Sequence, residues 1–323
     1  MIRRAYLYYP GCALQHRSHA YEVSNLAVAK ALGIELIELD DWNCCGATEY
    51  FSVNRLPAYA LVARNLARAA NAGVSEMVVP CSACYLNLYK TDKHMQQYPD
   101  LQLAVNQALD AGNLHYTPGS IHVRHLLEMI ITDIGFDMLR QRAQRPLYGL
   151  NLAAYYGCLI ARPESVFDST EHPTTMDRMI EALGARAVPF ALKTFCCGGH
   201  MAQVSEETAL GMIHQLIKNA VENGADAMVT ICPMCQLNLD VYQSYANKLF
   251  DTNYSMPVMF FTQAIGLALG LSPDELGLGQ EFVSVAPLLD RIREVPPPQA
   301  KPERRAKEAL PMPIMPIGGS YDE

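Results

Sequence analysis

The residues that could carry chemistry are ten cysteines, which fall into two sets of five in one repeated order. In each set a single cysteine comes first, an adjacent pair followed by glycine comes next, and a Cys-x-x-Cys element comes last. The spacing is C-x31-CC-x35-C-x2-C in the first set and C-x37-CC-x34-C-x2-C in the second. The sets are Cys12, Cys44, Cys45, Cys81 and Cys84, and then Cys158, Cys196, Cys197, Cys232 and Cys235. Because no cysteine is left over, the sequence predicts one thiolate-rich site in each half of the chain.

Three kinds of chemistry use clustered thiols. Disulfide bonds are disfavoured because adjacent cysteines such as Cys44 and Cys45 do not readily pair with each other. A structural zinc ion takes four ligands, so two zinc ions would leave two of the ten cysteines unused. Iron–sulfur centres suit soft thiolate ligands, although the ferredoxin spacings are absent and a cubane cluster needs only four thiolates. Five thiolates in each half favour an iron–sulfur centre that uses an extra ligand, with zinc and disulfides as alternatives, and the spacing does not define the cluster geometry.

Each cysteine element follows a segment with the pattern of a short buried strand, and helical segments separate these strands. In the first half we expect strands at 5–9, 34–39 and 77–79 and helices at 19–32, 56–72 and 125–134. In the second half we expect strands at 152–156, 187–191 and 227–231, helices at 176–183 and 206–223, and a helix that begins at Cys232. This alternation predicts an α/β fold with a mainly parallel sheet. Sites in such sheets form beyond the carboxyl ends of the strands, so the five cysteines of each half should converge there.

The second half repeats the first at an offset of about 150 residues. The segment GVSEMVVPCSACYLNLYK, for example, matches GADAMVTICPMCQLNLDVY. We therefore predict two duplicated domains, at 1–145 and 146–280, each a small mainly parallel sheet with flanking helices, related by a pseudo-two-fold axis. Residues 281–323 are expected to form an extended Pro-rich tail, because proline and charge combine there without a helical or strand period. The apolar segment 256–271 is expected to be a buried helix or a docking surface.

Composition and charge exclude several classes of protein. The formal net charge is −8 and no basic block precedes the tail, which argues against a nucleic-acid partner. No stretch approaches the roughly 18 uninterrupted apolar residues of a transmembrane segment, and the N-terminus lacks the pattern of an export signal. In a reducing compartment, cysteine-rich patterns indicate metal or redox chemistry. We therefore expect a cytoplasmic protein that reaches a membrane only through its partners.

With these residues, the chain resembles the family of heterodisulfide reductase B subunits, which carry two copies of the cysteine-rich CCG domain. The resemblance covers roughly residues 4–275 and includes all ten cysteines. It implies two noncubane 4Fe-4S clusters, each with the five cysteines of one set as ligands. It also implies catalysis, in which a disulfide is made or broken between the two clusters, and the sulfur-oxidation-type complexes are included in this resemblance.

The same resemblance implies partners. Family members receive electrons from a C subunit with two cubane 4Fe-4S clusters and from a flavin-bearing A subunit. Their substrate is a disulfide, a thiol or a sulfur-carrier protein. The CCG domain also occurs in succinate/fumarate, glycolate and lactate oxidoreductases, where its role is closer to electron relay, so an electron-relay subunit is the alternative function.

Few residues other than cysteine have a position that predicts a role. His200 directly follows the second Cys-Cys-Gly-Gly, and it is the candidate proton donor to a departing thiolate because histidine titrates near neutral pH. His16, His19 and Glu49 are weaker candidates for the same role. Trp42, just before the first cysteine pair, either shields a cluster from water or packs in the core. The tyrosines before the first cysteine of each half are expected to be strand core: Tyr8, Tyr9, Tyr155 and Tyr156.

Overall fold

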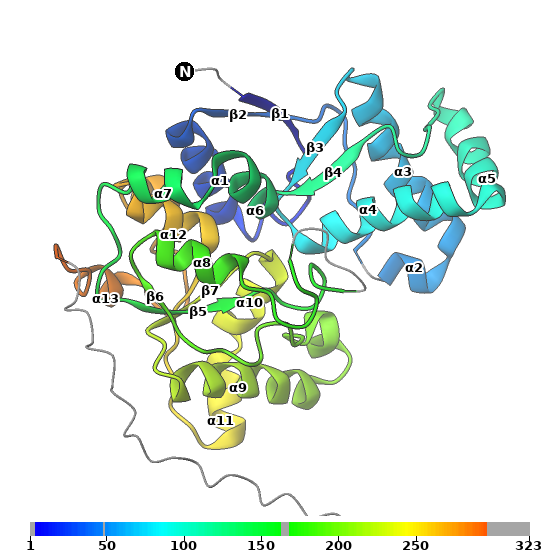
Figure 1. Ribbon diagram of the computed structural model, residues 1–323. Coiled ribbons are helices and arrows are strands. Elements are labelled where there is room, and N and C mark those ends of the chain that lie inside the picture. Colours follow the sequence, from blue (N-terminus) through cyan, green and yellow to red (C-terminus); the bar gives the residue numbers. More distant parts are fainter. Residues whose placement is uncertain (1–3, 48, 163–167, 296–323) are drawn as a thin grey trace, which may run out of the picture.

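Two four-stranded parallel sheets form the framework of the protein (Figure 1). The computed structural model describes residues 4–47, 49–162 and 168–295. The first sheet contains β1 (Arg4–Tyr8), β2 (Ile34–Glu38), β3 (Glu76–Val79) and β4 (His122–His125). The second contains β5 (Asn151–Tyr155), β6 (Arg186–Ala187), β7 (Ala227–Thr230) and β8 (Val258–Phe260).

The two sheets have the same topology. Their strand orders are β2-β1-β3-β4 and β6-β5-β7-β8, and every neighbouring pair is parallel. The last strand of each sheet also has the same register, since Val79 pairs with His125 and Thr230 pairs with Phe260. The predicted α/β fold with two duplicated parallel sheets is thus confirmed.

Helices flank both sheets. Those of the first half are α1 (His19–Leu32), α2 (Glu49–Val53), α3 (Arg55–Asn71), α4 (Ser82–Gln97), α5 (Pro99–Leu109), α6 (Leu126–Met129) and α7 (Phe136–Arg142). Those of the second half are α8 (Thr175–Ala182), α9 (Glu206–Glu222), α10 (Pro233–Val241), α11 (Gln243–Phe250), α12 (Phe261–Ala268) and α13 (Ala286–Leu289). Short turns complete the described residues: the 3-10 helices η1 (Asp110–Gly112), η3 (Gly199–Gln203) and η4 (Asp274–Leu276), and the π-helix η2 (Ile130–Ile134).

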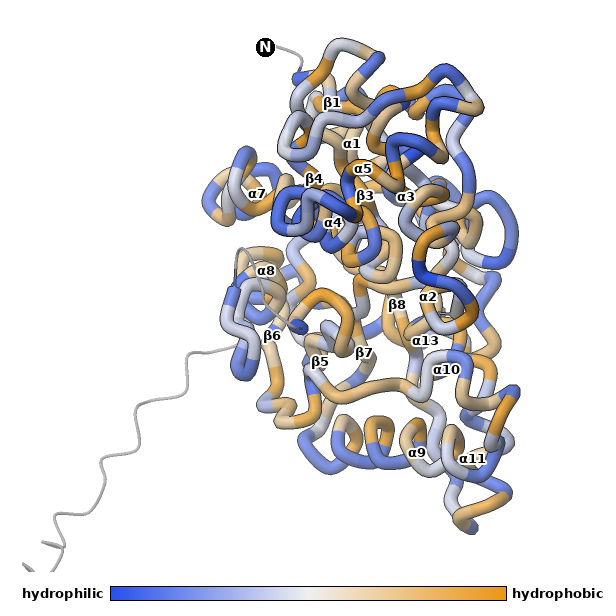
Figure 2. The backbone as a smooth tube through the Cα atoms, turned by 90° about the vertical axis from the view of Figure 1, so that its right-hand side faces the viewer, coloured by the Kyte–Doolittle hydropathy of each residue, from blue (hydrophilic) through white to orange (hydrophobic). Residues whose placement is uncertain are grey.

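The hydrophobic core lies where helices cover the sheets. All four residues of β7 are buried, as expected for a parallel strand that is covered on both faces. Figure 2 shows hydrophobic and hydrophilic residues alternating along α9, and its buried residues, which include Ile213, Leu216 and Ile217, recur at helical spacing. In the described part of the chain, no helix has both the length and the apolar character needed to cross a membrane.

The two halves contact each other through α1 and α12, which lie side by side (Figure 1). Tyr21 on α1 stacks on Phe260 at the end of β8, with a centroid distance of 4.1 Å and an interplanar angle of 6°. Ser24 and Thr262 form a hydrogen bond of 2.7 Å between their hydroxyl groups. Helix α12 of the second half therefore completes the packing of the first.

The structure differs from the sequence prediction at the ends of both sheets. The predicted helix at 125–134 is preceded by a strand, because β4 ends at His125 and runs directly into α6. The segment 256–271, predicted as a buried helix or a docking surface, begins with the strand β8, which runs directly into α12. Short apolar runs have no period that separates a strand from a buried helix. The strand predicted at 187–191 is also shorter, since Pro189 has no N–H group to donate to the ladder.

Residues 281–295, predicted as the start of the tail, pack on the second half. They include α13, and the side chains of Val285 and Leu288 are buried. The backbone N–H groups of Phe282 and Val283 each donate to the Asp240 carboxylate at 2.9 Å. Residues 296–323 lie outside the described residues, so for them the extended tail stays a prediction.

Candidate functional site

All ten cysteines lie just beyond the carboxyl ends of strands, where the sequence predicts them. Cys12 follows β1, the Cys44-Cys45 pair follows β2, and Cys81 and Cys84 follow β3 at the start of α4. The second set has the same places after β5, β6 and β7. All ten are free thiols, and the members of each set come together although they are far apart in sequence.

In the first set each sulfur atom lies next to another, in the spatial order Cys12, Cys44, Cys45, Cys84 and Cys81. The Sγ atoms of Cys12 and Cys44 are 3.5 Å apart, and those of Cys45 and Cys84 are 3.3 Å apart. Cys44 also interacts with Cys45, and Cys84 with Cys81. The five sulfurs therefore form a row that begins at the exposed Cys12 and ends at the buried Cys81.

The second set repeats this row and joins the first. Cys158 interacts with Cys196, Cys196 with Cys197, Cys197 with Cys235, and Cys235 with Cys232. The side chain of Cys232 in turn interacts with that of Cys81 across the contact between the halves. Together the ten sulfurs form one continuous row, which we call the sulfur row, with Cys81 and Cys232 at its centre.

The thiols of the row share protons in the same way in both halves. A hydrogen bond from Cys12 to the Cys44 sulfur lowers the pKa of Cys44 well below its usual value, and the bond raises the pKa of Cys12. The same bond between Cys158 and Cys196 lowers the pKa of Cys196 and raises that of Cys158. The protein alone thus favours one thiolate beside a protonated thiol, and a positively charged metal is needed to hold all of them as thiolates.

A glycine before the first cysteine of each half makes room for a sulfur. A Cβ atom on Gly11 would lie 2.9 Å from the Sγ of Cys84, and a Cβ on Gly157 would lie 2.9 Å from the Sγ of Cys235. Both glycines have a left-handed backbone, with φ of +78° and +70°. These two positions require glycine because the backbone conformation and the sulfur both exclude a side chain.

Two asparagines hold the Cys-Cys-Gly loops, and the sequence reasoning missed them. Asn87 Nδ2 donates to the carbonyls of Cys45 at 3.1 Å and of Ala47. Asn238 Nδ2 donates to the carbonyls of Cys197 at 3.1 Å and of Gly199 at 2.8 Å. The signal was present in the repeat, since an asparagine stands three residues after the last cysteine of each set.

The four tyrosines before the first cysteines are buried, as predicted for strand core. Tyr9 and Tyr155 have a further role, because the Tyr9 hydroxyl donates to the Asn43 carbonyl at 2.7 Å and the Tyr155 hydroxyl to the Phe195 carbonyl at 2.8 Å. Those carbonyls belong to the residues just before the cysteine pairs. Burial, followed by the nearby thiolates, raises the pKa of both tyrosines, so their hydroxyls remain protonated donors.

The other predicted site residues lie at different distances from this centre. His200 is half-buried in η3, three residues after Cys197. His16 is exposed just before α1, and His19 is exposed at the start of α1. Trp42 packs its ring edge on Tyr9 at 5.3 Å and donates through Nε1 to Glu38 at 2.8 Å. The side chain of Glu49, also predicted, lies outside the described residues.

The residues present fit a metal–sulfur group. Five soft thiol ligands per half converge, and glycine leaves the space that their sulfurs occupy. Within the described residues, no group of three or more His, Cys, Asp and Glu side chains is arranged around the position of a single metal ion. The thiols of each set lie along the sulfur row, so a group bound there would contact thiols that are spread along it.

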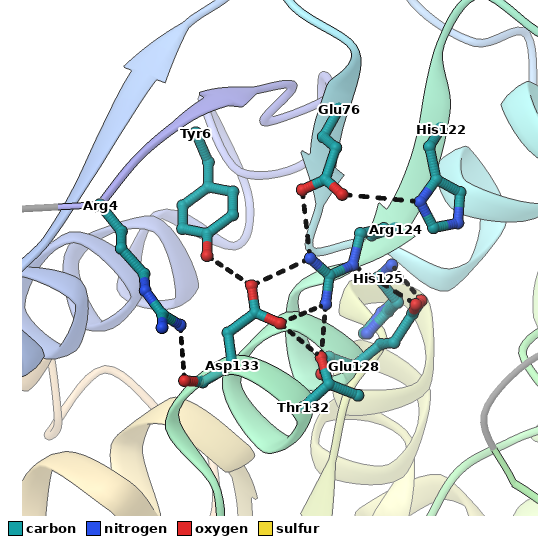
Figure 3. A network of polar contacts seen from close by, with 9 residues as sticks. All are labelled: Arg4, Tyr6, Glu76, His122, Arg124, His125, Glu128, Thr132 and Asp133. Atoms are coloured by element: carbon teal, nitrogen blue, oxygen red, sulfur yellow. Dashed lines mark hydrogen bonds and ion pairs between the residues drawn. The ribbon is translucent and has the colours of Figure 1, made fainter.

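A charged network surrounds Arg124 of β4 in the first half (Figure 3). The buried Arg124 guanidinium pairs with Asp133 at 2.8 Å, with Glu76 at 3.2 Å and with Glu128 at 3.4 Å. Tyr6 donates a further hydrogen bond to Asp133. Glu128 also accepts from the backbone N–H of His125 at 3.3 Å. The network thus fixes the end of β4 where it approaches the centre of the sulfur row.

Comparison with known families agrees with the repeated site. The family described as "Cysteine-rich domain" (CCG) matches residues 6–89 and 152–240, and these ranges include all ten cysteines. Fold and site together define a protein built from two CCG cysteine-rich domains.

Curated relatives cover nearly the whole chain. The 8-methylmenaquinol:fumarate reductase membrane anchor subunit of Wolinella succinogenes is 34% identical over 89% of this chain and 100% of that protein. The B subunit of the ferredoxin/F(420)H(2)-dependent CoB-CoM heterodisulfide reductase of Methanosarcina acetivorans is 32% identical over 88% of this chain and 96% of that protein. The chain belongs to the family of heterodisulfide reductase B subunits and similar proteins with two CCG domains.

A solved structure supports the fold alone. A hypothetical protein from Helicobacter pylori aligns with a TM-score of 0.70 at 18% identity. The alignment covers 88% of this chain and 53% of that one, so this chain spans about half of that structure.

Proposed function

We propose that the chain is the catalytic subunit of a heterodisulfide reductase-like complex, in which a disulfide is made or broken between two noncubane 4Fe-4S clusters. The observation that carries this proposal is the sulfur row, in which two equivalent five-cysteine sets meet at Cys81 and Cys232. A disulfide has two near-equivalent sulfur atoms, and the duplicated site offers two near-equivalent positions for them. Relatives named as B subunits of heterodisulfide reductases, at 30% and 32% identity, support the proposal.

In this proposal all ten cysteines are cluster ligands. The first cluster is held by Cys12, Cys44, Cys45, Cys81 and Cys84, and the second by Cys158, Cys196, Cys197, Cys232 and Cys235. When bound, the clusters would supply the two electrons that, with two protons, convert one disulfide into two thiols. The chain itself holds the loops in place through Asn87 and Asn238 and leaves room for sulfur at Gly11 and Gly157.

His200 remains our candidate for proton delivery at the second set. It lies three residues after Cys197 in a short 3-10 helix, and histidine exchanges a proton near neutral pH. At the first set, Cys12 and Cys44 are exposed, so protons from water can reach that end of the row directly.

We further propose that the chain works in a complex with a C-like subunit carrying two cubane 4Fe-4S clusters and a flavin-bearing A-like subunit. A disulfide, a thiol or a sulfur-carrier protein would be the substrate. The domains are proposed to be 1–145 and 146–280, followed by a Pro-rich tail at 281–323, of which residues 281–295 pack on the second half. The proposal includes no nucleic-acid partner and a cytoplasmic location, with any membrane association made by partners.

An electron-relay role is the second candidate. It is favoured by the relative at 34% identity, whose name assigns it to a fumarate reductase. In a relay the sulfur row would connect two redox centres, and no disulfide would bind between them.

Reconstitution of the full chain with iron and sulfide tests both candidates. We expect iron and acid-labile sulfide sufficient for two clusters, and a paramagnetic signal that changes when a thiol or disulfide is added. A preparation that takes up zinc and no sulfide would contradict both candidates. A full complement of iron and sulfide with a signal that no thiol or disulfide changes would instead support the relay.

A further inference from the structure

Two backbone carbonyl groups at the centre of the sulfur row lie within reach of the same hydroxyl group. They belong to Pro80 and Ile231, the residues directly before Cys81 and Cys232. The side chains of these two cysteines interact with each other, which joins the first set to the second. Whatever holds the two carbonyls together therefore also holds the two halves of the row at one separation.

A single buried hydroxyl reaches both carbonyls. The Tyr21 hydroxyl lies 3.0 Å from the Pro80 oxygen and 3.4 Å from the Ile231 oxygen. The Tyr21 side chain is fully buried, and its ring stacks on Phe260 of the other half. Ser82 adds a second hydroxyl, which donates to the Ile231 oxygen at 3.4 Å.

A histidine lies against the same two carbonyls. His125 is completely buried at the end of β4, and Figure 3 shows it beside Glu128. Its Nδ1 accepts from the backbone N–H of Leu127 at 3.2 Å, so the neutral ring carries its proton on Nε2. That Nε2 is buried and has no hydrogen-bond partner among the described residues, and the ring interacts with the Pro80 and Ile231 backbone. A buried donor without a partner thus lies near the point where the two halves meet.

The donors come from the first half alone. Register places Phe260 of the second half where His125 stands in the first, and the repeat places Pro233 where Ser82 stands. Neither Phe260 nor Pro233 has a side-chain donor. The contact is therefore an asymmetric addition to a symmetric site, and the packing of two equivalent domains does not by itself require it.

We propose that Tyr21 is a positioning residue that sets the separation between the two cysteine sets, and with it the electronic coupling of whatever the sets bind. For the coupling of two clusters this inference rests on the function proposed above. The separation itself belongs to the protein, and it can be measured without any cluster.

The first test measures the separation in metal-free full-length protein. Diamide, which takes up two electrons and two protons, converts a thiol pair within contact into a disulfide. We expect a peptide linked through Cys81 and Cys232 in the digest of the wild type. In Tyr21→Phe its yield should fall roughly fivefold, the effect of one typical hydrogen bond. The matched control is Tyr116→Phe, which removes a buried hydroxyl bonded to Asp92 at 2.6 Å, away from the site. Equal yields in all three proteins would overturn the inference.

The second test measures coupling in the reconstituted protein. Tyr21→Phe should keep the iron and sulfide content of the wild type and weaken the magnetic interaction between its reduced clusters, while Tyr116→Phe should change neither. An unchanged interaction in Tyr21→Phe would overturn the inference as it applies to clusters. Should the wild type bind no pair of clusters, the proposed function fails, and the cross-linking result still decides whether Tyr21 sets the separation.

Discussion

The glycine before each first cysteine offers a test in which backbone strain and sulfur contact can be separated. Gly11 and Gly33 have the same φ of +78°, but a Cβ on Gly11 meets the Cys84 sulfur at 2.9 Å, while a Cβ on Gly33 meets nothing within 4 Å. An alanine in the left-handed region costs about 1–2 kcal/mol, and both substitutions carry this cost. The Tyr9 ring, 3.6 Å from a Cβ on Gly11, is in ordinary contact, so the difference between Gly11→Ala and Gly33→Ala reports mainly the sulfur contact.

The size of that difference follows from the geometry. Ordinary contact begins at 3.4 Å, so the Cys84 sulfur must retreat by at least about 0.5 Å from a Cβ at 2.9 Å. Metal sites hold their ligand distances to within about 0.2 Å, and overpacking costs about 1–3 kcal/mol. We expect Gly33→Ala to lose about 1–2 kcal/mol of unfolding free energy and keep its full iron and sulfide content. Gly11→Ala should lose about 2–5 kcal/mol and close to half of the iron and sulfide.

The assay is iron and acid-labile sulfide per chain after reconstitution, together with urea unfolding of the metal-free chain. Gly157→Ala, at the equivalent place in the second half, should give the same partial loss with the other cluster retained. Full iron and sulfide content in Gly11→Ala, or an equal loss in Gly33→Ala, would show that the space beside Cys84 does not matter for the site.

Four further outcomes follow from other contacts. Cys45→Ser and Cys197→Ser should each remove about half of the iron and sulfide, and loss of all iron in either variant would contradict two independent sites. Asn87→Ala leaves two loop carbonyls without their donor, at about 1–3 kcal/mol, so a chelator should remove iron faster than from the wild type, and an unchanged rate counts against this tether. Arg124→Met leaves buried carboxylates unpaired and should lower the urea-measured unfolding free energy by about 3–5 kcal/mol; a loss below about 1 kcal/mol would mean that the network is not needed. Burial would raise the pKa of Asp133, but hydrogen bonds led by that from Arg124 hold the pKa well below its usual value. Its contribution to stability is therefore complete above about pH 4 and is lost as the pH falls through the lowered pKa, so metal-free wild type should lose more stability on acidification than Asp133→Asn, and parallel pH curves would contradict this.

The sequence predicts the elements that carry the cysteines and misses those that close each sheet. The helix at 19–32 has the bounds expected from its apolar spacing and its terminal glycine. β4 was missed because its sequence HVRH is polar, and its one arginine is buried only because three carboxylates from other segments surround it. Ion pairs with residues outside the strand leave no strand pattern within it from which β4 could be predicted.

The site likewise has one part that the sequence predicts and one part that it does not. The grouping of the cysteines follows from spacing and from the rule that sites form at the carboxyl ends of parallel strands. The contact between Cys81 and Cys232 does not, because it depends on how α1 of one half packs against β8 and α12 of the other. Tyr21 could not be found from the sequence for this reason: its position in α1 predicts only a core residue, and its role comes from the surface that the other half presents to it.

The two halves share the residues that position the cysteine sulfurs, but they differ in the charged and polar residues around those sulfurs. Glycine and asparagine stand at equivalent positions in both halves. The buried Arg124 pairs with Val78 in the first sheet, and the equivalent partner of Val229 in the second sheet is the uncharged Met259. Ion pairs and hydrogen bonds near a cluster set its reduction potential, together with its exposure to solvent. Solvent exposure also differs, because Cys12 and Cys44 are exposed while the equivalent Cys158 and Cys196 are partly covered. For the two clusters proposed above, different surroundings predict different reduction potentials, and such a difference would give electron transfer along the row a preferred direction.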